Sequence, residues 1–565
     1  MPPTPWSRLP GILTVFTVVV GVGYRLALLA YAAPPTNSDE ATMGLAALHI
    51  ARGEGFPIWF YGQQYMGTLE AYLAAPVFAL AGGPSLLGLR LPTLALYALF
   101  LVAAWRLTLR LTGDRWFGLL VVALLALGSD RVVKSQLIAG GGYPEMNAAA
   151  VALALLAVDL AAGRPEWRLA RWAGWGFLAG LLLWVDPLAL PYVVATGAVL
   201  VAFRWRELRG APGALLGTAA VLGAAPMLVH SLLSGRSPLD PVLAAGGANA
   251  TADWADRLHG GLLLGPPLGM GFCDPGRCAG WQLWWALALP VLLATAGVTA
   301  WRALRRPAVT AWRPADSAST TGAAGDGARR ADTRVSAAMR LVLVLAAVAT
   351  LAAYTVSSAA GLTPVESSRY LFGLLVSLPA LLWPLWTAAQ RALLGRAADR
   401  RAVVGPTADR HALVGPAGDR RGPWWTVTGS VALAVLVATV GTAAHATWRA
   451  AQIVPATRAA EARHADLVTT LRQLGVRHVR AGYWTCNRLT FASAEHVVCA
   501  VVDDTLRPGF DRYPAYGRAV QRSPAPAWVA PADSPLAARL DEQSRAAPGS
   551  LELVAVDGWR IYLPR

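Results

Sequence analysis

Residues 9–31 read LPGILTVFTVVVGVGYRLALLAY, a long apolar run that follows Arg8. A helix needs about 20 apolar residues to cross the hydrocarbon core of a bilayer. Within lipid the segment must satisfy its own backbone hydrogen bonds, which favours a helix. No clear small-residue cleavage site precedes the next polar segment, so we expect a retained first membrane helix over 11–32 and not a cleaved signal peptide.

The whole chain has the composition of a membrane protein. Of its 565 residues, 55% are hydrophobic and 15% are charged, whereas roughly 25% of residues are charged in typical soluble proteins. The mean hydropathy is +0.44. We therefore predict an all-α polytopic membrane protein with about eleven transmembrane helices. They are expected at 11–32, 88–105, 117–129, 146–162, a hairpin within 173–203, 211–233, 281–301, 339–360, 370–388 and 425–446.

The net charge of +16 comes almost entirely from arginine, and Lys134 is the only lysine. A strongly basic chain can bind nucleic acid, but this one has no zinc-finger spacing, basic helix or RNA-binding signature, so we expect no nucleic-acid partner. The arginines fall in short loops between apolar segments, where they mark the cytoplasmic side. Arg8 then places the N-terminus inside, and an odd number of crossings places the segment after residue 446 outside.

The first expected outer loop, residues 33–87, contains helix signals of its own. Asn37-Ser38-Asp39-Glu40 has a capping residue followed by acids, which is typical of a helix start. The aromatic cluster at 56–61 is typical of the membrane–water interface. Residues 68–81 are apolar but too short to cross comfortably. We predict two helices, about 38–51 and 68–81, that lie at the outer surface.

Two further segments differ from the membrane part in composition. Residues 302–338 show little apolar periodicity, and 389–423 contain a ten-residue low-complexity repeat, so we predict disordered cytoplasmic loops. Residues 447–565 have scattered charges and alternating apolar positions, and they are long enough for a modest core. The chain is thus divided into a membrane domain, 1–446, and an extracytoplasmic α/β domain, 447–565.

The four cysteines all fall on the expected outer side. Cys273 and Cys278 lie in the loop at 234–280, and Cys486 and Cys499 lie in the C-terminal segment. Disulfides belong to oxidising compartments. We hypothesise the bonds 273–278 and 486–499; the alternative is four free buried thiols.

Ionisable side chains gather at the expected outer face, where carboxylates beside cations suit transfer from an anionic lipid carrier. Asp39 directly follows the first membrane helix and is our candidate for a general base, although an acid there also complements a helix N-terminus. Arg131 and Lys134 could bind phosphate or anchor a helix end at the interface. The candidates for substrate contact are Glu40, Glu70, Arg131, Lys134, Tyr143, Glu145, Arg369 and Tyr370.

The histidines His49, His230 and His259 are isolated in sequence, so no metal site is predicted. Whether the protein needs a divalent metal stays open.

Several short motifs follow one another along most of the chain. They are NSDE at 37–40, FYGQQYMGTLEAY at 60–72, LRLP at 89–92, GGYPE at 141–145, SRYL at 368–371 and GYWTCNRLTF at 482–491. In their order and sidedness they resemble bacterial GT-C fold glycosyltransferases, relatives of the protein O-mannosyltransferases and of the lipid A aminoarabinose transferase. One departure is that the lysine which the aminoarabinose transferases carry before a Pro-Pro in the first loop has no match here.

The resemblance implies a GT-C-like fold in the cytoplasmic membrane of a bacterium and a sugar donor carried on polyprenyl phosphate. It implies that the acid at Asp39 is the base and that basic outer residues, Arg369 and Lys134 here, hold the donor phosphate. The expected reaction is inverting transfer of a hexosyl or pentosyl group to a hydroxyl of a glycan, lipid or protein.

Two other classes remain open. A transporter or flippase of polyprenyl-linked sugars usually shows internal repeats and ionisable groups near the bilayer midplane, which this sequence does not show. A membrane-anchored binding protein would use residues 447–565 alone for recognition.

Overall fold

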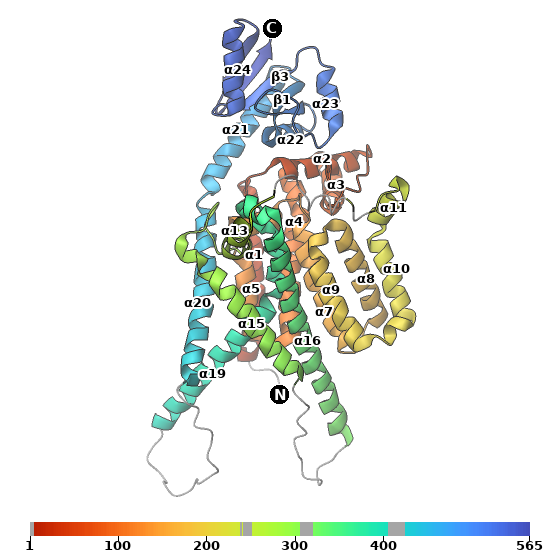
Figure 1. The fold of residues 1–565 in the computed structure, drawn as a ribbon, viewed down its shortest axis with the longest axis vertical. Helices are drawn as coiled ribbons and strands as arrows, with labels where there is room; N and C mark the ends of the chain where they lie inside the picture. Colours follow the sequence, from red (N-terminus) through yellow and green to blue (C-terminus); the bar gives the residue numbers. More distant parts are fainter. Residues whose placement is uncertain (1–4, 238–239, 241–250, 306–319, 405–423) are drawn as a thin grey trace.

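The computed structural model describes residues 5–237, 240, 251–305, 320–404 and 424–565. A long helical bundle carries a small α/β domain at one end, and the N-terminus lies at the opposite end (Figure 1). The long helices of the bundle are α1 (Pro5–Ala30), α4 (Leu86–Thr112), α5 (Arg115–Ala126), α7 (Tyr143–Ala161), α8 (Arg168–Val185), α9 (Leu190–Arg204), α10 (Ala211–Gly223), α11 (Ala225–Ser234), α15 (Trp284–Arg305), α16 (Thr320–Val356), α19 (Leu378–Val404) and α20 (Trp424–Ala451).

Short helices connect and cover these long ones. They are α2 (Ser38–Arg52), α3 (Leu69–Ala81), α6 (Asp130–Leu137), η1 (Pro187–Ala189), η2 (Glu207–Arg209), α13 (Trp254–Leu258), η3 (His259–Leu264), α14 (Gly265–Gly269), η4 (Gly280–Leu283), α17 (Ser358–Leu362), α18 (Pro364–Ser367) and η6 (Ser368–Ser377).

The chain is a multi-pass membrane protein. Eight of the described helices are long and apolar enough to cross a bilayer, or up to ten if the bent pairs α5–α6 and α10–α11 each form one span. We predicted about eleven membrane helices. The predicted helix that is not among these spans is α8, which is present in the structure. Arg168 and Arg171 in its first turn reduce its apolar content.

The segments predicted to be disordered are helical where the structure describes them. α15 continues to Arg305, α16 begins at Thr320, and α19 continues to Val404. The structure therefore corrects the prediction for 302–305, 320–338 and 389–404, because each residue added to an existing helix gains a backbone hydrogen bond. The remainder of both segments, 306–319 and 405–423, lies outside the described residues.

The two predicted surface helices of the first outer loop are α2 and α3. The Asn37 side chain caps α2 by accepting a 2.8 Å hydrogen bond from the Glu40 N–H, and the helix ends at Gly53 in the left-handed conformation, as helices commonly do. The loop expected at 130–145 contains one more helix, α6, which turns by 89° from α5. Figure 1 shows α2 and α3 lying between the bundle and the C-terminal domain.

The C-terminal segment is the predicted α/β domain. Its five strands have the order β2-β1-β3-β5-β4, with β1 parallel to β2 and β3, and β5 antiparallel to β3 and β4. The strands and helices of this domain are α21 (Val454–Gln473), β1 (His478–Gly482), α22 (Tyr483–Ala492), β2 (Val498–Val502), α23 (Pro514–Gln521), β3 (Ala527–Pro531), α24 (Pro535–Ala546), β4 (Leu551–Val556) and β5 (Trp559–Pro564).

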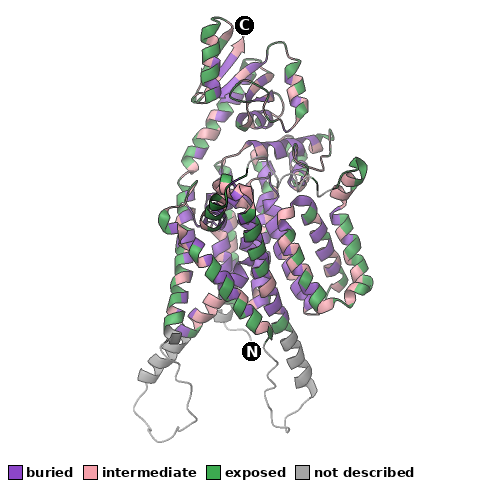
Figure 2. Cartoon of the chain, in the orientation of Figure 1, coloured by how far each residue is buried: buried purple, intermediate pink, exposed green. Residues whose placement is uncertain are grey.

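A shared apolar core joins this domain to the membrane part. Leu45, Leu48 and Phe78 of α2 and α3 form one buried cluster with Phe491 and Tyr516 of the C-terminal domain. Figure 2 shows α2 buried along most of its length. Burial of such apolar surface stabilises the contact between the two domains, so α2 is held from both sides.

Both hypothesised disulfides are present. One joins Cys273 to Cys278 and the other joins Cys486 to Cys499. The second ties α22 to β2, and α22 is the helix that packs on α2. It therefore stabilises the part of the C-terminal domain nearest to the bundle.

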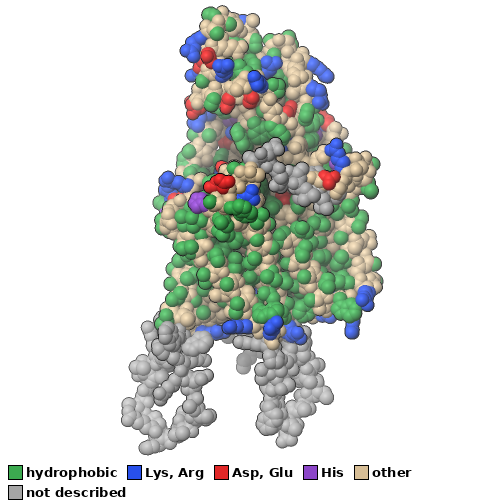
Figure 3. All heavy atoms as spheres, in the orientation of Figure 1, with side chains coloured by type: hydrophobic (Ala, Val, Ile, Leu, Met, Phe, Trp, Pro, Cys, Tyr) green, Lys and Arg blue, Asp and Glu red, His purple; other side chains and the backbone are tan. Residues whose placement is uncertain are grey.

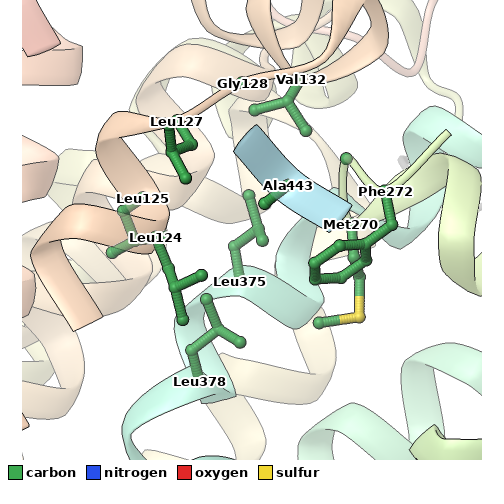
Figure 4. Close-up of a pocket in the computed structure, with 11 residues that line it drawn as sticks. Leu124, Leu125, Leu127, Gly128, Val132, Met270, Phe272, Leu375, Leu378 and Ala443 are labelled. Atoms are coloured by element: carbon green, nitrogen blue, oxygen red, sulfur yellow. The ribbon is translucent and has the colours of Figure 1, made fainter. Parts of the chain in front are cut away.

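One cavity lies inside the bundle and is apolar. Figure 4 shows it between Leu124, Leu375, Met270 and their neighbours, and its volume is about 20 Å³. This is room for about one water molecule, and the lining contains no ionisable side chain. The cavity is therefore no candidate for the chemistry.

Candidate active site

Asp39 lies in the first turn of α2, beneath the C-terminal domain. Its Oδ1 accepts a 2.5 Å hydrogen bond from the Tyr483 hydroxyl and a 2.8 Å hydrogen bond from Nη2 of Arg512. Among the described residues, no hydrogen bond reaches its Oδ2. The Asp39 side chain is 17% exposed, so it is not sealed off inside the protein.

A glycine loop fixes the backbone of Asp39 from the bundle side. Gly140 has φ +142°, and a Cβ there would lie 3.2 Å from the carbonyl carbon and oxygen of Asp39. Only glycine adopts such a backbone freely. The triplet Gly140–Gly142 thus supports the start of α2 and leads into Tyr143 at the start of α7.

Glu40, predicted as a substrate contact, is instead placed in a buried ion pair. Its two oxygens accept hydrogen bonds of 2.6 Å each from Arg90 of α4. The two side chains are 0% and 1% exposed. Glu40 therefore fastens α2 to the bundle next to the candidate base.

Three further acids lie buried at the same end of the bundle. Glu70 of α3 faces Glu145 of α7 and the amides of the glycine loop, and burial together with the charge of Glu145 raises the pKa of Glu70 well above its usual value. Asp186 caps η1 by accepting from the Leu188 N–H. Burial raises the pKa of Asp186 to about 7, although that N–H and the nearby Arg369 oppose the shift.

Of the three predicted cations, Arg369 has the surroundings that best suit anion binding. Its guanidinium carbon lies 6.0 Å from the ring centre of Tyr143 and 5.6 Å from that of Tyr370, and it interacts electrostatically with Asp39. Its Nε is buried and has no hydrogen-bond partner among the described residues. The structure thus brings together Asp39, Tyr143, Arg369 and Tyr370 from three separate segments, the starts of α2, α7 and η6.

The other two predicted cations lie on α6. The Lys134 ammonium is already paired with Asp130 at 2.8 Å. Arg131 has a buried Nε without a hydrogen-bond partner among the described residues. No contact within the described part of the chain joins either side chain to Asp39, so their place in the site is not established by geometry.

A cluster with metal-binding side-chain types joins α2 to the C-terminal domain. Ligand atoms of His49, Glu54 and Glu495 lie within 4.8 Å of one another. Nε2 of His49 lies 2.9 Å from Glu495, and Arg52 pairs with the same carboxylate. Although burial opposes it, hydrogen bonds from His49 and Tyr516 lower the pKa of Glu495 to about 2. Arg52 supplies the positive charge that a metal ion would otherwise supply to Glu495. The cluster therefore acts as a polar link between the domains.

Sequence reasoning missed Tyr483 and Arg512. Tyr483 stands in the GYWTCNRLTF motif, whose resemblance was noted without a role for the tyrosine. Arg512 is one of many arginines, and nothing in its sequence surroundings distinguishes it. Asp186 lies between α8 and η1, within the predicted hairpin, but its burial near Arg369 is visible only in the folded chain.

No protein-family model matches the chain, and no curated protein matches it. Among solved structures, ArnT from Cupriavidus metallidurans bound to undecaprenyl phosphate overlaps it with a TM-score of 0.56 at 13% identity, covering 99% of this chain and 97% of that one. The same protein in the apo state has a TM-score of 0.53 at 14% identity and the same coverage. The archaeal oligosaccharyltransferase AglB from Archaeoglobus fulgidus has a TM-score of 0.45 at 12% identity, with 99% of this chain and 74% of that chain covered, which is too low to support an argument.

The chain therefore has the GT-C-like fold that the sequence motifs predicted, along 99% of its length. ArnT, the lipid A aminoarabinose transferase, is one solved protein with this fold. At 13–14% identity the likeness establishes the fold alone.

Proposed function

We propose that this protein is a glycosyltransferase that moves a sugar from a polyprenyl-phosphate donor to an acceptor hydroxyl. The observation that carries the proposal is the electrostatic interaction of Asp39, which has one oxygen without a hydrogen bond among the described residues, with Arg369, whose buried Nε has no partner there. A carboxylate and a cation with an unpaired N–H at one site suit proton abstraction and phosphate binding in one step. ArnT, which shares the fold, was solved with undecaprenyl phosphate bound.

The proposed step balances without a second acid. Asp39 takes the proton of the acceptor hydroxyl as its oxygen attacks the anomeric carbon of the donor. The bond between that carbon and the phosphate oxygen breaks, and its electron pair stays on the phosphate. Arg369 stabilises the dianion that forms, while Tyr143 and Tyr370 hold the guanidinium by packing against it. Attack from the face opposite the phosphate inverts the anomeric configuration.

We place this site on the outer face of the cytoplasmic membrane of a bacterium, with the N-terminus inside. Arginines gather at the end of the bundle opposite to the C-terminal domain (Figure 3), which is the pattern of cytoplasmic loops. The disulfide in the C-terminal domain suits an oxidising compartment. The acceptor is a glycan, a lipid or a protein that carries a free hydroxyl.

The test is transfer of radiolabelled sugar from a panel of polyprenyl-phosphate sugars, in membranes that contain the wild type or Asp39→Asn. We expect transfer by the wild type and loss of at least about 100-fold in the variant, as for removal of a positioned general base. Equal activity of the two proteins would remove Asp39 as the base. If proteoliposomes moved the labelled donor across the bilayer without any transfer, the protein would be a flippase instead.

A further inference from the structure

The C-terminal domain reaches the candidate base directly. Tyr483 begins α22, and Arg512 lies just before α23, yet both donate to the same oxygen of Asp39. Nε of Arg512 also donates to the Tyr483 hydroxyl. The three side chains form a closed triangle in which each contacts the other two. Burial and the charge of Asp39 raise the pKa of the Tyr483 hydroxyl, so it remains a donor.

The first outer loop is shaped to receive Arg512. The guanidinium carbon lies 4.7 Å from the ring centre of Phe60, and Nη1 donates to the Tyr61 carbonyl at 3.3 Å. Gly62 has φ +75°, and a Cβ there would lie 3.2 Å from the Cα of Arg512. The Phe60-Tyr61-Gly62 motif is thus explained by packing around this arginine, which is only 8% exposed.

A second set of contacts fixes α22 beside the base. The Ser38 hydroxyl donates to the Tyr483 carbonyl at 2.7 Å and accepts from the Asn487 amide at 3.0 Å. Phe491 packs so closely on α2 that a Cβ at Gly44 would lie 2.4 Å from its ring. The position of Tyr483 relative to Asp39 is therefore set by several independent contacts.

We propose that Arg512 and Tyr483 of the C-terminal domain are positioning residues for Asp39. They hold Oδ1 by two hydrogen bonds and thereby direct Oδ2 toward the acceptor hydroxyl. Arg512 is committed to Asp39, Tyr483 and the Tyr61 carbonyl, in contrast to Arg369, whose Nε is unpaired among the described residues. This inference rests on the proposed function, because it assigns a role to residues around the same base.

The consequence is that catalysis needs both parts of the chain. The membrane domain contributes Asp39 and Arg369, but the orientation of the base depends on the docked C-terminal domain. A misplacement of the base by about 1 Å can cost about 100-fold in rate. A C-terminal domain that merely selected the acceptor would leave the orientation of Asp39 unchanged.

The experiment measures transfer by four variants against the wild type, with the donor that the wild type uses. Arg512→Ala is expected to lower kcat about 10- to 100-fold with less than about 3-fold change in the donor KM. Tyr483→Phe, which removes a single hydroxyl, is expected to lower kcat about 10-fold. Arg512→Lys should recover part of the loss, since it restores a positive donor. Arg518→Ala, at an exposed position of α23, is the matched control and should equal the wild type.

Chemical rescue separates positioning from a structural role. Guanidinium ion added to Arg512→Ala should restore part of kcat, because it can occupy the cavity left by the side chain and donate to Asp39 again. A variant that was inactive only through misfolding would gain nothing from the added ion. Folding is checked independently by mapping the Cys486–Cys499 disulfide in each variant.

The outcomes distinguish this inference from the proposed function. A raised donor KM with unchanged kcat in Arg512→Ala would make Arg512 a phosphate ligand, and the inference would be wrong. Wild-type rates in both Arg512→Ala and Tyr483→Phe, while Asp39→Asn is inactive, would also overturn it and leave the proposed function intact. Absence of transfer by the wild type with every donor would count against the proposed function and this inference together. Transfer by Asp39→Asn would overturn the assignment of Asp39 as the base and the positioning role of Arg512 and Tyr483, but not the transferase function.

Discussion

The carboxylate of Glu40 accepts two hydrogen bonds from the guanidinium of Arg90, each 2.6 Å long, and both side chains are buried. Its neighbour Asp39 points to the C-terminal domain and remains partly exposed. Adjacent residues of a helix face different directions, so Glu40 has a structural role while the neighbouring Asp39 is free for the chemical role that we propose. The stability of variants at Asp39 and at Glu40 can therefore be compared directly.

Glu40→Gln is expected to destabilise the protein strongly. Removing one partner leaves the Arg90 charge buried without compensation, which typically costs about 3–5 kcal/mol. Thermal unfolding in detergent should show a lower melting temperature for Glu40→Gln and a smaller decrease for Asp39→Asn, because the pair of Asp39 and Arg512 is less buried. Identical melting of Glu40→Gln and the wild type would contradict the structural role assigned to the buried pair.

Arg369→Ala should reduce transfer more than Lys134→Ala. A hydrogen bond to a charged group contributes about 1.5–3 kcal/mol, which corresponds to about 10- to 100-fold in the steady-state rate. Lys134 is already paired with Asp130, so its loss should change the rate by less than about 3-fold. The measurement is kcat/KM for the polyprenyl-phosphate donor. A larger effect at Lys134 would move the phosphate site toward α6.

Stability should depend on pH through Asp186. The ordinary pKa of an aspartate is about 3.9 in an unfolded chain, and burial raises the pKa of Asp186 in the folded protein to about 7. The folded state therefore binds the proton more tightly, and stability falls as the pH rises from about 4 to about 7. Asp186→Asn, which can still cap η1, should lack this decrease. Melting temperatures at pH 4.5, 6 and 8 test it, and parallel curves for the two proteins would contradict the expected shift.

Gly44→Val should lower transfer without touching Asp39. A Cβ at Gly44 would lie 2.4 Å from the Phe491 ring, so the larger side chain must displace α22 and with it Tyr483. Gly55→Val is the control, since no heavy atom lies within 4 Å of a Cβ at Gly55. We expect a loss of about 10-fold or more at position 44, as for a small displacement of the base, and under 2-fold at position 55. Unchanged transfer by Gly44→Val would mean that exact docking of α22 is not needed.

Local sequence patterns predicted most of the architecture. Apolar runs gave the membrane helices, because a segment in lipid must close its own backbone hydrogen bonds. The start of α2 at Asn37–Glu40 followed from capping preferences, and the disulfide at Cys486 and Cys499 followed from sidedness and proximity in sequence. The location of Asp39 near the end of the bundle was also predictable, since it stands shortly after the first membrane helix.

Only the tertiary structure decided the partners of the acids. Arg512 is separated from Asp39 by 473 residues and Tyr483 by 444, and no pattern within a short window connects them. Glu40 and Asp39 are indistinguishable in sequence, but packing against α4 buries one and docking of the C-terminal domain orients the other. The sequence alone determined which ionisable side chains lie near the end of the bundle that carries the C-terminal domain. Their individual roles depend on which are desolvated and paired when the two domains meet, and that is a property of the assembled fold.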